Sequence, residues 1–157
     1  MLGKLNPDEI EELLRTQFVG RIGCSADGLV YIVPISYAYE DGWVYCHSAQ
    51  GRKLDMMRKN PKVCFEVDDL RDMANWKSVV AQGVFEELHE RAPIHHCVRV
   101  LTGRYLPVIS SETMHLGRLW PFEPDDESEI EGVFFRICLG ERSGRFESDS
   151  QSPLIVG

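Results

Sequence analysis

The chain has 157 residues, of which 43% are hydrophobic and 27% charged, and its formal net charge is −8 at pH 7. This composition is typical of a globular protein of one domain and excludes a disordered chain. The acidic balance argues against a general nucleic-acid binder or a binder of anionic membranes, because both need a surface excess of Lys and Arg. It leaves room for a local basic pocket.

The first fourteen residues contain several acidic side chains and no apolar segment, so we expect neither a signal peptide nor a membrane anchor, and a cytoplasmic location. No apolar run approaches the roughly 18 residues that a spanning helix needs. The five cysteines form no C-x-x-C pair, and we expect reduced, buried thiols. We predict no metal site, because the neighbours His95-His96-Cys97 point about 100° apart on a helix.

Apolar periodicity and turn residues predict an α+β chain that is mainly β. Asn6-Pro7-Asp8-Glu9 has the pattern of an N-cap, a first-turn proline and a Glu at N3, which predicts a helix over 7–17. Asp27-Gly28 and Asp41-Gly42 are residue pairs that favour tight hairpins. They separate strands expected at 18–25, 29–39 and 43–47, which we interpret as a three-stranded meander.

The remaining elements are a helix over 51–60, strands at 62–67 and 78–88 with Gly83 as a candidate bulge, a helix over 91–102 and a strand at 132–139. Six mostly antiparallel strands with helices at the edges exclude a doubly wound sheet. We predict a six-stranded, partly open antiparallel barrel in one domain over 1–146, followed by a C-terminal tail over 147–157. Residues 106–131, rich in proline and acidic side chains, are expected to form a long irregular excursion.

One segment points to chemistry. The run from His47 to Lys53 reads His-Ser-Ala-Gln-Gly-Arg-Lys and follows the apolar-aromatic run Trp43-Val44-Tyr45-Cys46. A strand that stops at a small-residue turn and opens into a helix with Arg52 and Lys53 aims backbone N–H groups and cations at one point. We interpret this corner as a phosphate site.

Five short segments occur in order at close spacing. They are Gly20-Arg21-Ile22-Gly23, Val33-Pro34-Ile35-Ser36-Tyr37, His47-Ser48-Ala49 with Gly51 and Lys53, Val63-Cys64-Phe65-Glu66-Val67, and Trp76-Lys77-Ser78-Val79 with Gly83. Together they resemble the pyridoxamine 5′-phosphate oxidase-related split-barrel flavoproteins, and within them the branch similar to 5-nitroimidazole reductases. The resemblance covers residues 1 to about 90 well and the remainder in outline. It implies a six-stranded split β-barrel, a homodimer and non-covalent FMN at the subunit interface.

The resemblance also assigns site residues. The FMN phosphate needs cations and donors, for which Arg52, Lys53, the N–H groups near Gly51 and the Ser78 hydroxyl are suited. The flavin ring would lie along the strand segment 34–37, and His47 would be the catalytic residue on the substrate side. The full predicted cofactor set is Pro34, Ile35, Ser36, Tyr37, His47, Ser48, Ala49, Gly51, Arg52, Lys53, Trp76, Ser78 and Val79.

Several of these residues keep a second interpretation. Tyr37 can instead pack in the core of an ordinary strand, and His47 can be a satisfied polar residue at a strand end. Arg21 fits a structural salt bridge as well as a phosphate contact. Trp76 fits either a cover over the cofactor or a closure of the dimer interface, and Arg52 fits a solvent-exposed charge.

The expected function is an FMN-dependent oxidoreductase that passes electrons to a small acceptor such as a nitroaromatic, with NAD(P)H or another protein as the donor. The alternatives are a non-enzymatic FMN store or sensor, a haem-binding relative, and a pyridoxamine 5′-phosphate oxidase. The last is disfavoured because Arg118-Leu119-Trp120-Pro121 matches that enzyme's C-terminal Arg-Leu-x-Pro segment only well before the end of the chain.

Overall fold

The computed structural model describes residues 1–104 and 130–149, which form three helices and eight strands. The helices are α1 (Pro7–Thr16), α2 (Arg52–Lys59) and α3 (Arg91–Gly103). The strands are β1 (Leu2–Lys4), β2 (Val19–Ala26), β3 (Leu29–Ser36), β4 (Ala38–Glu40), β5 (Trp43–Ser48), β6 (Lys62–Asp72), β7 (Asn75–Glu87) and β8 (Val133–Glu147).

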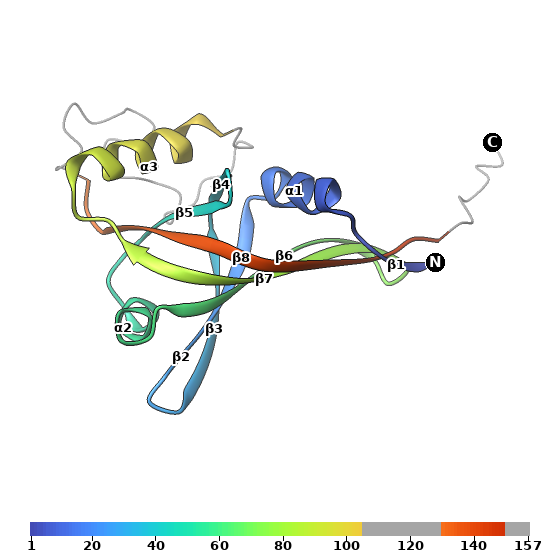
Figure 1. Ribbon diagram of the computed structural model, residues 1–157, viewed down its shortest axis with the longest axis horizontal. Coiled ribbons are helices and arrows are strands. Elements are labelled where there is room, and N and C mark those ends of the chain that lie inside the picture. Colours follow the sequence, from blue (N-terminus) through green and yellow to red (C-terminus); the bar gives the residue numbers. More distant parts are fainter. Residues whose placement is uncertain (105–129, 150–157) are drawn as a thin grey trace.

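All strands join one antiparallel sheet in the order β3-β2-β6-β7-β8-β5-β4, with β1 added on β8. In Figure 1 the long strands β6, β7 and β8 cross the molecule, and the β2–β3 hairpin projects away from them. The sheet does not close on itself, and the helices lie at its periphery. The predicted antiparallel split barrel is confirmed, but the predicted count of six strands is wrong because β1 and β4, three residues each, are too short to show alternation.

The expected strand over 29–39 is two strands that break at Tyr37. The Tyr37 amide donates to the Phe18 carbonyl (3.0 Å), and its hydroxyl donates to the Leu14 carbonyl (2.7 Å). The chain leaves β2 at this point, and β4 pairs with β5 instead. The predicted meander is therefore wrong: β5 pairs with β4 and β8, and it is not a neighbour of β3 in the sheet.

Both predicted Asp-Gly turns are confirmed. The φ angles are +53° and +80° at Asp27 and Gly28, and +48° and +85° at Asp41 and Gly42. This conformation matches the right-handed twist of the strands that each pair connects. The first pair joins β2 to β3, and the second joins β4 to β5.

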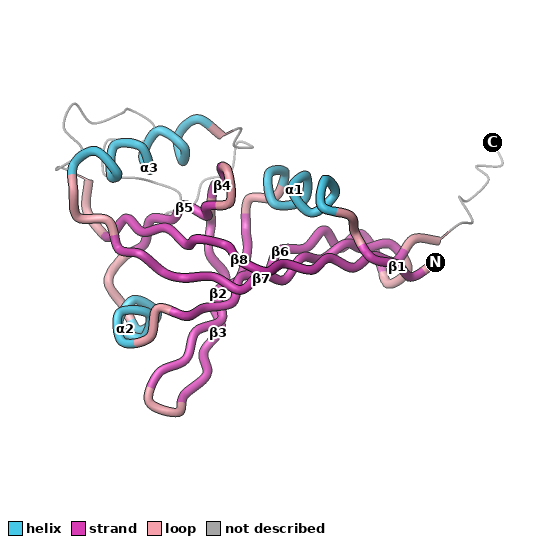
Figure 2. Tube along the Cα trace, viewed as in Figure 1, coloured by secondary structure: helices cyan, strands magenta, loops and turns pink. Residues whose placement is uncertain are grey.

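Strands β6 and β7 extend beyond their predicted ends and meet in a turn held by Asp72, whose Oδ1 accepts from the Ala74 amide (2.8 Å) and Asn75 Nδ2 (3.0 Å). Figure 2 shows these strands continuing beside β8 and β1 as an arm. Strand β8 runs through the predicted boundary at residue 146, and the Ser148 amide donates to the Met1 carbonyl (2.9 Å). Residues 105–129, with most of the expected excursion and its Arg-Leu-x-Pro match, and residues 150–157 lie outside the described part.

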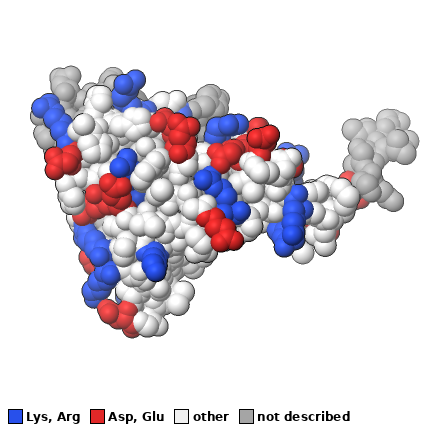
Figure 3. All heavy atoms as spheres, in the orientation of Figure 1, with Lys and Arg blue, Asp and Glu red and all other residues white. Residues whose placement is uncertain are grey.

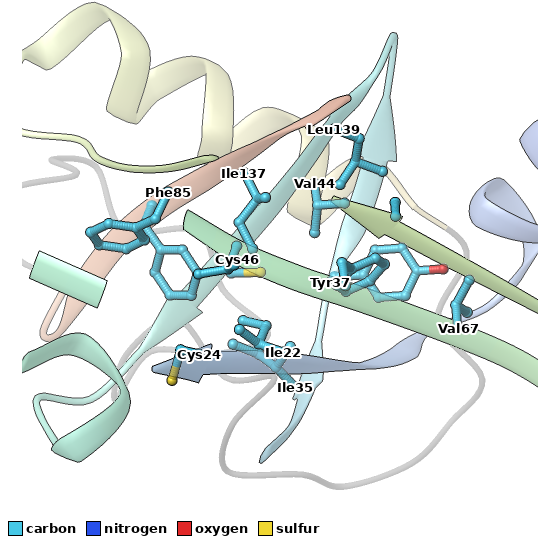
Figure 4. Close-up of a cluster of buried hydrophobic side chains, with 14 of the residues drawn as sticks. Ile22, Cys24, Ile35, Tyr37, Val44, Cys46, Val67, Phe85, Ile137 and Leu139 are labelled. Carbon is cyan, nitrogen blue, oxygen red and sulfur yellow. The ribbon is translucent and has the colours of Figure 1, made fainter. Parts of the chain in front are cut away.

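The main core has Tyr37, Phe65 and Phe135 as its largest fully buried side chains. Figure 4 shows members of this cluster from β2, β3, β5, β7 and β8 pointing toward one another. Helix α1 adds Ile10, Leu13 and Leu14 from one face, and its predicted capping box is present between Asn6 and Glu9. Helix α3 covers a second, smaller cluster on β4, β5 and β8.

All five cysteines are free, and Cys24, Cys46 and Cys97 are buried, whereas Cys64 is half-buried and Cys138 exposed. The β7–β8 register shifts at Gly83 as predicted, although the extra residue lies in β8; a Cβ at Gly83 would meet Ile137 Cγ2 at 2.5 Å. None of the described helices is long and apolar enough to cross a membrane.

Candidate functional site

A pocket of about 830 Å³ opens where β3 and β5 end. Because His47 pairs with Phe134 and Ser48 with Val133, the two residues that precede β8 lie beside the end of β5. The start of β2 and the turn into α2 complete the wall. The lining residues are Val19, Pro34, Ile35, Ser36, His47, Ser48, Ala49, Gln50, Lys53, Glu131 and Gly132.

Among the described residues that line the pocket, Lys53 is the cation, and it is half-buried in the first turn of α2. Burial lowers the pKa of its ammonium, and the thiols of Cys46 and Cys24 only partly offset this. Within the described ranges no carboxylate forms a salt bridge with Lys53. A partly desolvated ammonium that forms no salt bridge with these residues favours an anion as its ligand.

The turn before α2 has donors and space to accompany Lys53. Gly51 is the N-cap, and no side chain of the described residues caps the first N–H groups of the helix. A Cβ placed on Gly51 would meet nothing within 4 Å, so the space beside it is open. Free N–H groups at a helix start together with a cation fit a phosphate group. Ser48 adds no donor, because its hydroxyl donates to the Ala49 carbonyl (2.8 Å).

His47 is held by the backbone before β8. Its Nε2 lies 2.5 Å from the Glu131 carbonyl oxygen, which only accepts, so Nε2 carries the hydrogen. Burial lowers the pKa of the imidazole and outweighs this hydrogen bond, which raises it. A lowered pKa favours the neutral ring, whose Nδ1 accepts a hydrogen bond when Nε2 carries the hydrogen.

Gly132 is required by this arrangement. Its φ is +100°, and a Cβ there would lie 2.8 Å from His47 Nε2 and 2.9 Å from the Ser48 carbonyl oxygen. The position therefore combines a backbone conformation that favours glycine with a close approach to the imidazole. Gly132 was not among the predicted site residues, although a glycine at the start of the last expected strand is a visible signal.

The structure brings about half of the predicted set together at this pocket. The predicted residues that line it are Pro34, Ile35, Ser36, His47, Ser48, Ala49 and Lys53. Gly51 lies in the same turn. Arg52 points elsewhere: its guanidinium lies over the Tyr31 ring, 5.6 Å from the centroid.

Four predicted residues do not reach the pocket of their own chain. Tyr37 is fully buried in the core, 5.0 Å edge-on from Phe65, which agrees with its second interpretation. Val79 is also fully buried. Trp76 donates from Nε1 to the Glu147 carboxylate (3.1 Å), and Ser78 lies on β7 between its cross-strand partners on β6 and β8.

Trp76 and Ser78 nevertheless share a face of the sheet with the pocket wall. Cross-strand partners point to the same side, and the partner series runs from Pro34 through Arg21 and Glu66 to Val80 on β7. Ser78 and Trp76 lie two and four residues before Val80 on β7, so their side chains point to this same outer face. It also exposes apolar side chains, namely Val19 (49%), Val30 (80%), Ile32 (65%), Val80 (40%) and Val84 (52%).

Arg21 forms salt bridges on this outer face. Its Nη1 lies 3.2 Å from Glu66 Oε2 and 3.0 Å from Asp68 Oδ2. Burial and the neighbouring Asp68 carboxylate raise the pKa of Glu66 to about 7, and Arg21 only partly offsets them. Of its two interpretations, the structural salt bridge is the one that the geometry supports.

Four lining residues escaped the sequence analysis: Val19, Gln50, Glu131 and Gly132. Gln50 lies inside the segment that was singled out, but its residue type carries no charge signal. Elsewhere the surface is mixed, and Figure 3 shows acidic and basic side chains interspersed over the visible face. The described part of the chain contains no group of three or more His, Cys, Asp or Glu residues placed to hold a metal ion.

Known proteins match both the sequence and this fold. The sequence pattern of the family described as pyridoxamine 5′-phosphate oxidase matches residues 6–146. An uncharacterised protein of Rhizobium meliloti is 36% identical over 141 residues, which cover 90% of this chain and 92% of that protein. The crystal structure of an FAD-binding protein from Mesorhizobium loti is 34% identical with a TM-score of 0.72, over 94% of this chain and 99% of that chain.

The chain therefore belongs to the pyridoxamine 5′-phosphate oxidase family, and the resemblance inferred from the sequence is confirmed. A candidate 5-nitroimidazole antibiotic resistance protein from Bacteroides thetaiotaomicron shares the fold, with a TM-score of 0.70 at 16% identity over 93% of this chain and 87% of that chain.

Proposed function

We propose that this protein is a flavin-dependent oxidoreductase that holds FMN in the pocket at the ends of β3 and β5. The observation that carries the proposal is Lys53, a half-buried ammonium in that pocket with no carboxylate partner among the described residues. With the free N–H groups at the start of α2, it would hold the phosphate. The flavin ring would lie along Pro34 and Ser36, which are at the terminal strand of the sheet order, where a residue without an N–H is tolerated.

FAD is the second candidate cofactor, because the Mesorhizobium loti relative is described as FAD-binding. FAD contains the whole FMN moiety, so the contacts proposed for the ring and the first phosphate serve either cofactor. The two differ in whether the adenosine end finds room beyond Lys53. Release of the bound flavin by heat and separation from FMN and FAD standards distinguishes them.

A second copy of this chain would complete the site. Trp76 and Ser78 do not line the pocket of their own chain but lie on the outer face that carries its wall. A homodimer formed through this face would bury its exposed apolar side chains and bring the partner's copies of these two residues toward the pocket. Burial of Val19, Ile32 and Val80 would stabilise that contact.

A bound flavin supplies two-electron redox chemistry, and the protein supplies binding, orientation and electrostatics. NAD(P)H would be the electron donor, and a small nitroaromatic-like molecule the acceptor. His47 would face the substrate side with Nδ1, which accepts a hydrogen bond from a donor group on the acceptor molecule. Lys53 would stay charged against the phosphate.

Cofactor binding is tested with Lys53→Ala. We expect FMN affinity to fall about 10- to 100-fold, because a hydrogen bond to a charged group contributes about 1.5–3 kcal/mol. Lys59→Ala is the matched control, since Lys59 lies on the same helix but pairs with Asp27 on the surface (2.9 Å). Equal FMN affinity of Lys53→Ala and the control would refute the phosphate assignment. A Soret band in the purified protein would favour a haem-binding relative instead.

The dimer and the activity need separate measurements. Ile32→Glu should give a monomer in light scattering and should also weaken FMN binding, because the site needs both subunits. Met73→Glu, at the 93% exposed tip of the β6–β7 turn, should leave the dimer unchanged. An FMN-loaded monomer of the unaltered protein would contradict the shared site. Anaerobic mixing with NADH or NADPH should bleach the flavin absorbance. If neither nucleotide bleaches it and the protein does not turn over a nitroaromatic compound, the oxidoreductase proposal is refuted.

A further inference from the structure

Gln50 lines the pocket and directly precedes the N-cap of α2, three residues before Lys53. The residue is exposed, but its carboxamide oxygen has a partner. Arg58, in the last turn of α2, donates from Nη1 to Gln50 Oε1 at 2.9 Å. The guanidinium of Arg58 thus fixes the position of the Gln50 carboxamide.

Arg58 is itself anchored to the sheet. Its Nε donates to Glu87 Oε1 (3.1 Å), and its Nη2 donates to the same oxygen. Glu87 ends β7 and is only 16% exposed, so the carboxylate is fixed by its strand. The hydrogen bonds to Glu87 raise the pKa of Arg58, which stays charged. Glu87, Arg58 and Gln50 therefore form a continuous chain of contacts from the end of β7 to the pocket.

This chain decides which end of the Gln50 amide is available. A guanidinium has only N–H donors, so the carboxamide oxygen faces Arg58 and the amide nitrogen, with two N–H donors, faces away. Two other side chains of the pocket already donate to the backbone: the Ser48 hydroxyl to the Ala49 carbonyl, and His47 Nε2 to the Glu131 carbonyl. Among the described side chains that line the pocket, Gln50 and Lys53 are the ones with N–H groups left to donate. Arg52, at the start of α2, lies over the Tyr31 ring instead.

We infer that Gln50 is a phosphate ligand of the bound flavin and that Arg58 is a positioning residue, which holds the Gln50 amide N–H groups beside the Lys53 ammonium. The inference rests on the proposed flavin site. A long side chain that is already fixed loses less rotamer entropy on binding, so the ion-paired Arg58 increases the affinity for the phosphate without touching it.

The test compares FMN with riboflavin, which has the same ring and no phosphate. Gln50→Ala should weaken FMN binding about tenfold, the loss of one hydrogen bond to a charged group, and leave riboflavin binding unchanged. Gln50→Glu keeps an oxygen for Arg58 and removes both N–H donors, so it should fold normally and lose FMN more strongly than Gln50→Ala. Dissociation constants come from quenching of flavin fluorescence, and thermal unfolding reports the fold of each variant.

Arg58 is tested by a double-mutant cycle. Arg58→Ala alone should weaken FMN binding several-fold, and it should have no further effect in a Gln50→Ala background, because it acts only through Gln50. Arg15→Ala is the matched control: Arg15 is also in the last turn of its helix and pairs with Glu12 three residues earlier. It should leave FMN binding unchanged.

Two results overturn the inference. The first is that Gln50→Ala binds FMN as tightly as the wild type. The second is that Arg58→Ala lowers FMN affinity equally in the wild-type and Gln50→Ala backgrounds, which would give Arg58 a general structural role. In both cases the wild-type protein still binds FMN, so the proposed function stands. A wild-type protein that binds neither FMN nor riboflavin overturns both.

Discussion

Glu66 should make the stability of the protein fall between mildly acidic and mildly alkaline pH. Its pKa rises from 4.5 to about 7, because burial and Asp68 disfavour the charged form. A carboxyl whose pKa is higher in the folded state contributes stability that is complete below pH 4.5 and is lost as the pH rises through 7. At 1.36 kcal/mol per pKa unit the ceiling is about 3 kcal/mol, and solvent screening of a side chain that is 26% exposed reduces this to about 1–2 kcal/mol.

The perturbation is Glu66→Gln, which removes the titration and keeps the shape. We expect the variant to lie within about 0.5 kcal/mol of the wild type in free energy of unfolding at pH 5 and to exceed it by about 1–2 kcal/mol at pH 8, where the wild-type carboxylate repels Asp68. Urea unfolding at both pH values and at one protein concentration measures this. Glu86→Gln is the control, since it also removes a carboxylate paired with an arginine, Arg136 (3.0 Å). Parallel pH profiles of Glu66→Gln and the wild type would refute the reasoning.

Three further predictions concern the pocket and the core behind it. Gly132→Ala should lower the free energy of unfolding by about 1–3 kcal/mol and weaken flavin binding, because its Cβ would collide with the His47 ring at φ +100°, whereas Gly51→Ala should be neutral in thermal unfolding. Tyr37→Phe loses the hydrogen bond to the Leu14 carbonyl and should cost about 1–2 kcal/mol in urea unfolding with flavin affinity unchanged; a loss of flavin would return Tyr37 to the site. Because the pKa of His47 is lowered in the folded state, its contribution to the free energy of unfolding is complete above pH 6.5 and is lost as the pH falls below that value. An NMR titration should therefore find this imidazole protonating below pH 6.5.

Elements that depend on a few neighbouring residues could be predicted from the sequence. The capping box at Asn6 and Glu9 forms because both partners lie within one turn of helix. The Asp-Gly pairs make their hairpins because both residues accept positive φ. The corner from His47 to Lys53 was found for the same reason: strand end, small-residue turn and cation follow one another in the chain.

Pairings between distant segments could not be predicted in this way. The alternating pattern of β3 does not show that the chain leaves β2 after Ser36 and pairs with β5 as β4. This change of partner depends on Tyr37, whose hydroxyl donates to the Leu14 carbonyl of α1. Likewise, β1 forms because its three residues pair with the end of β8, from Leu2 opposite Glu147 to Lys4 opposite Arg145. Glu131 and Gly132 reach the pocket through the same kind of pairing, between β5 and β8.

The period of a strand also limits which predicted residues can act as side-chain ligands. Successive residues of a strand point to opposite faces, so Trp76-Lys77-Ser78-Val79 cannot all contact one ligand. Val79 points into the core with no exposure, and Trp76 and Ser78 point to the outer face. The same parity sends Tyr37 inward while Pro34 and Ser36 face outward. If a second copy of the chain completes the pocket, β7 can offer it the side chains of Trp76 and Ser78, and Val79 can take part only through its backbone.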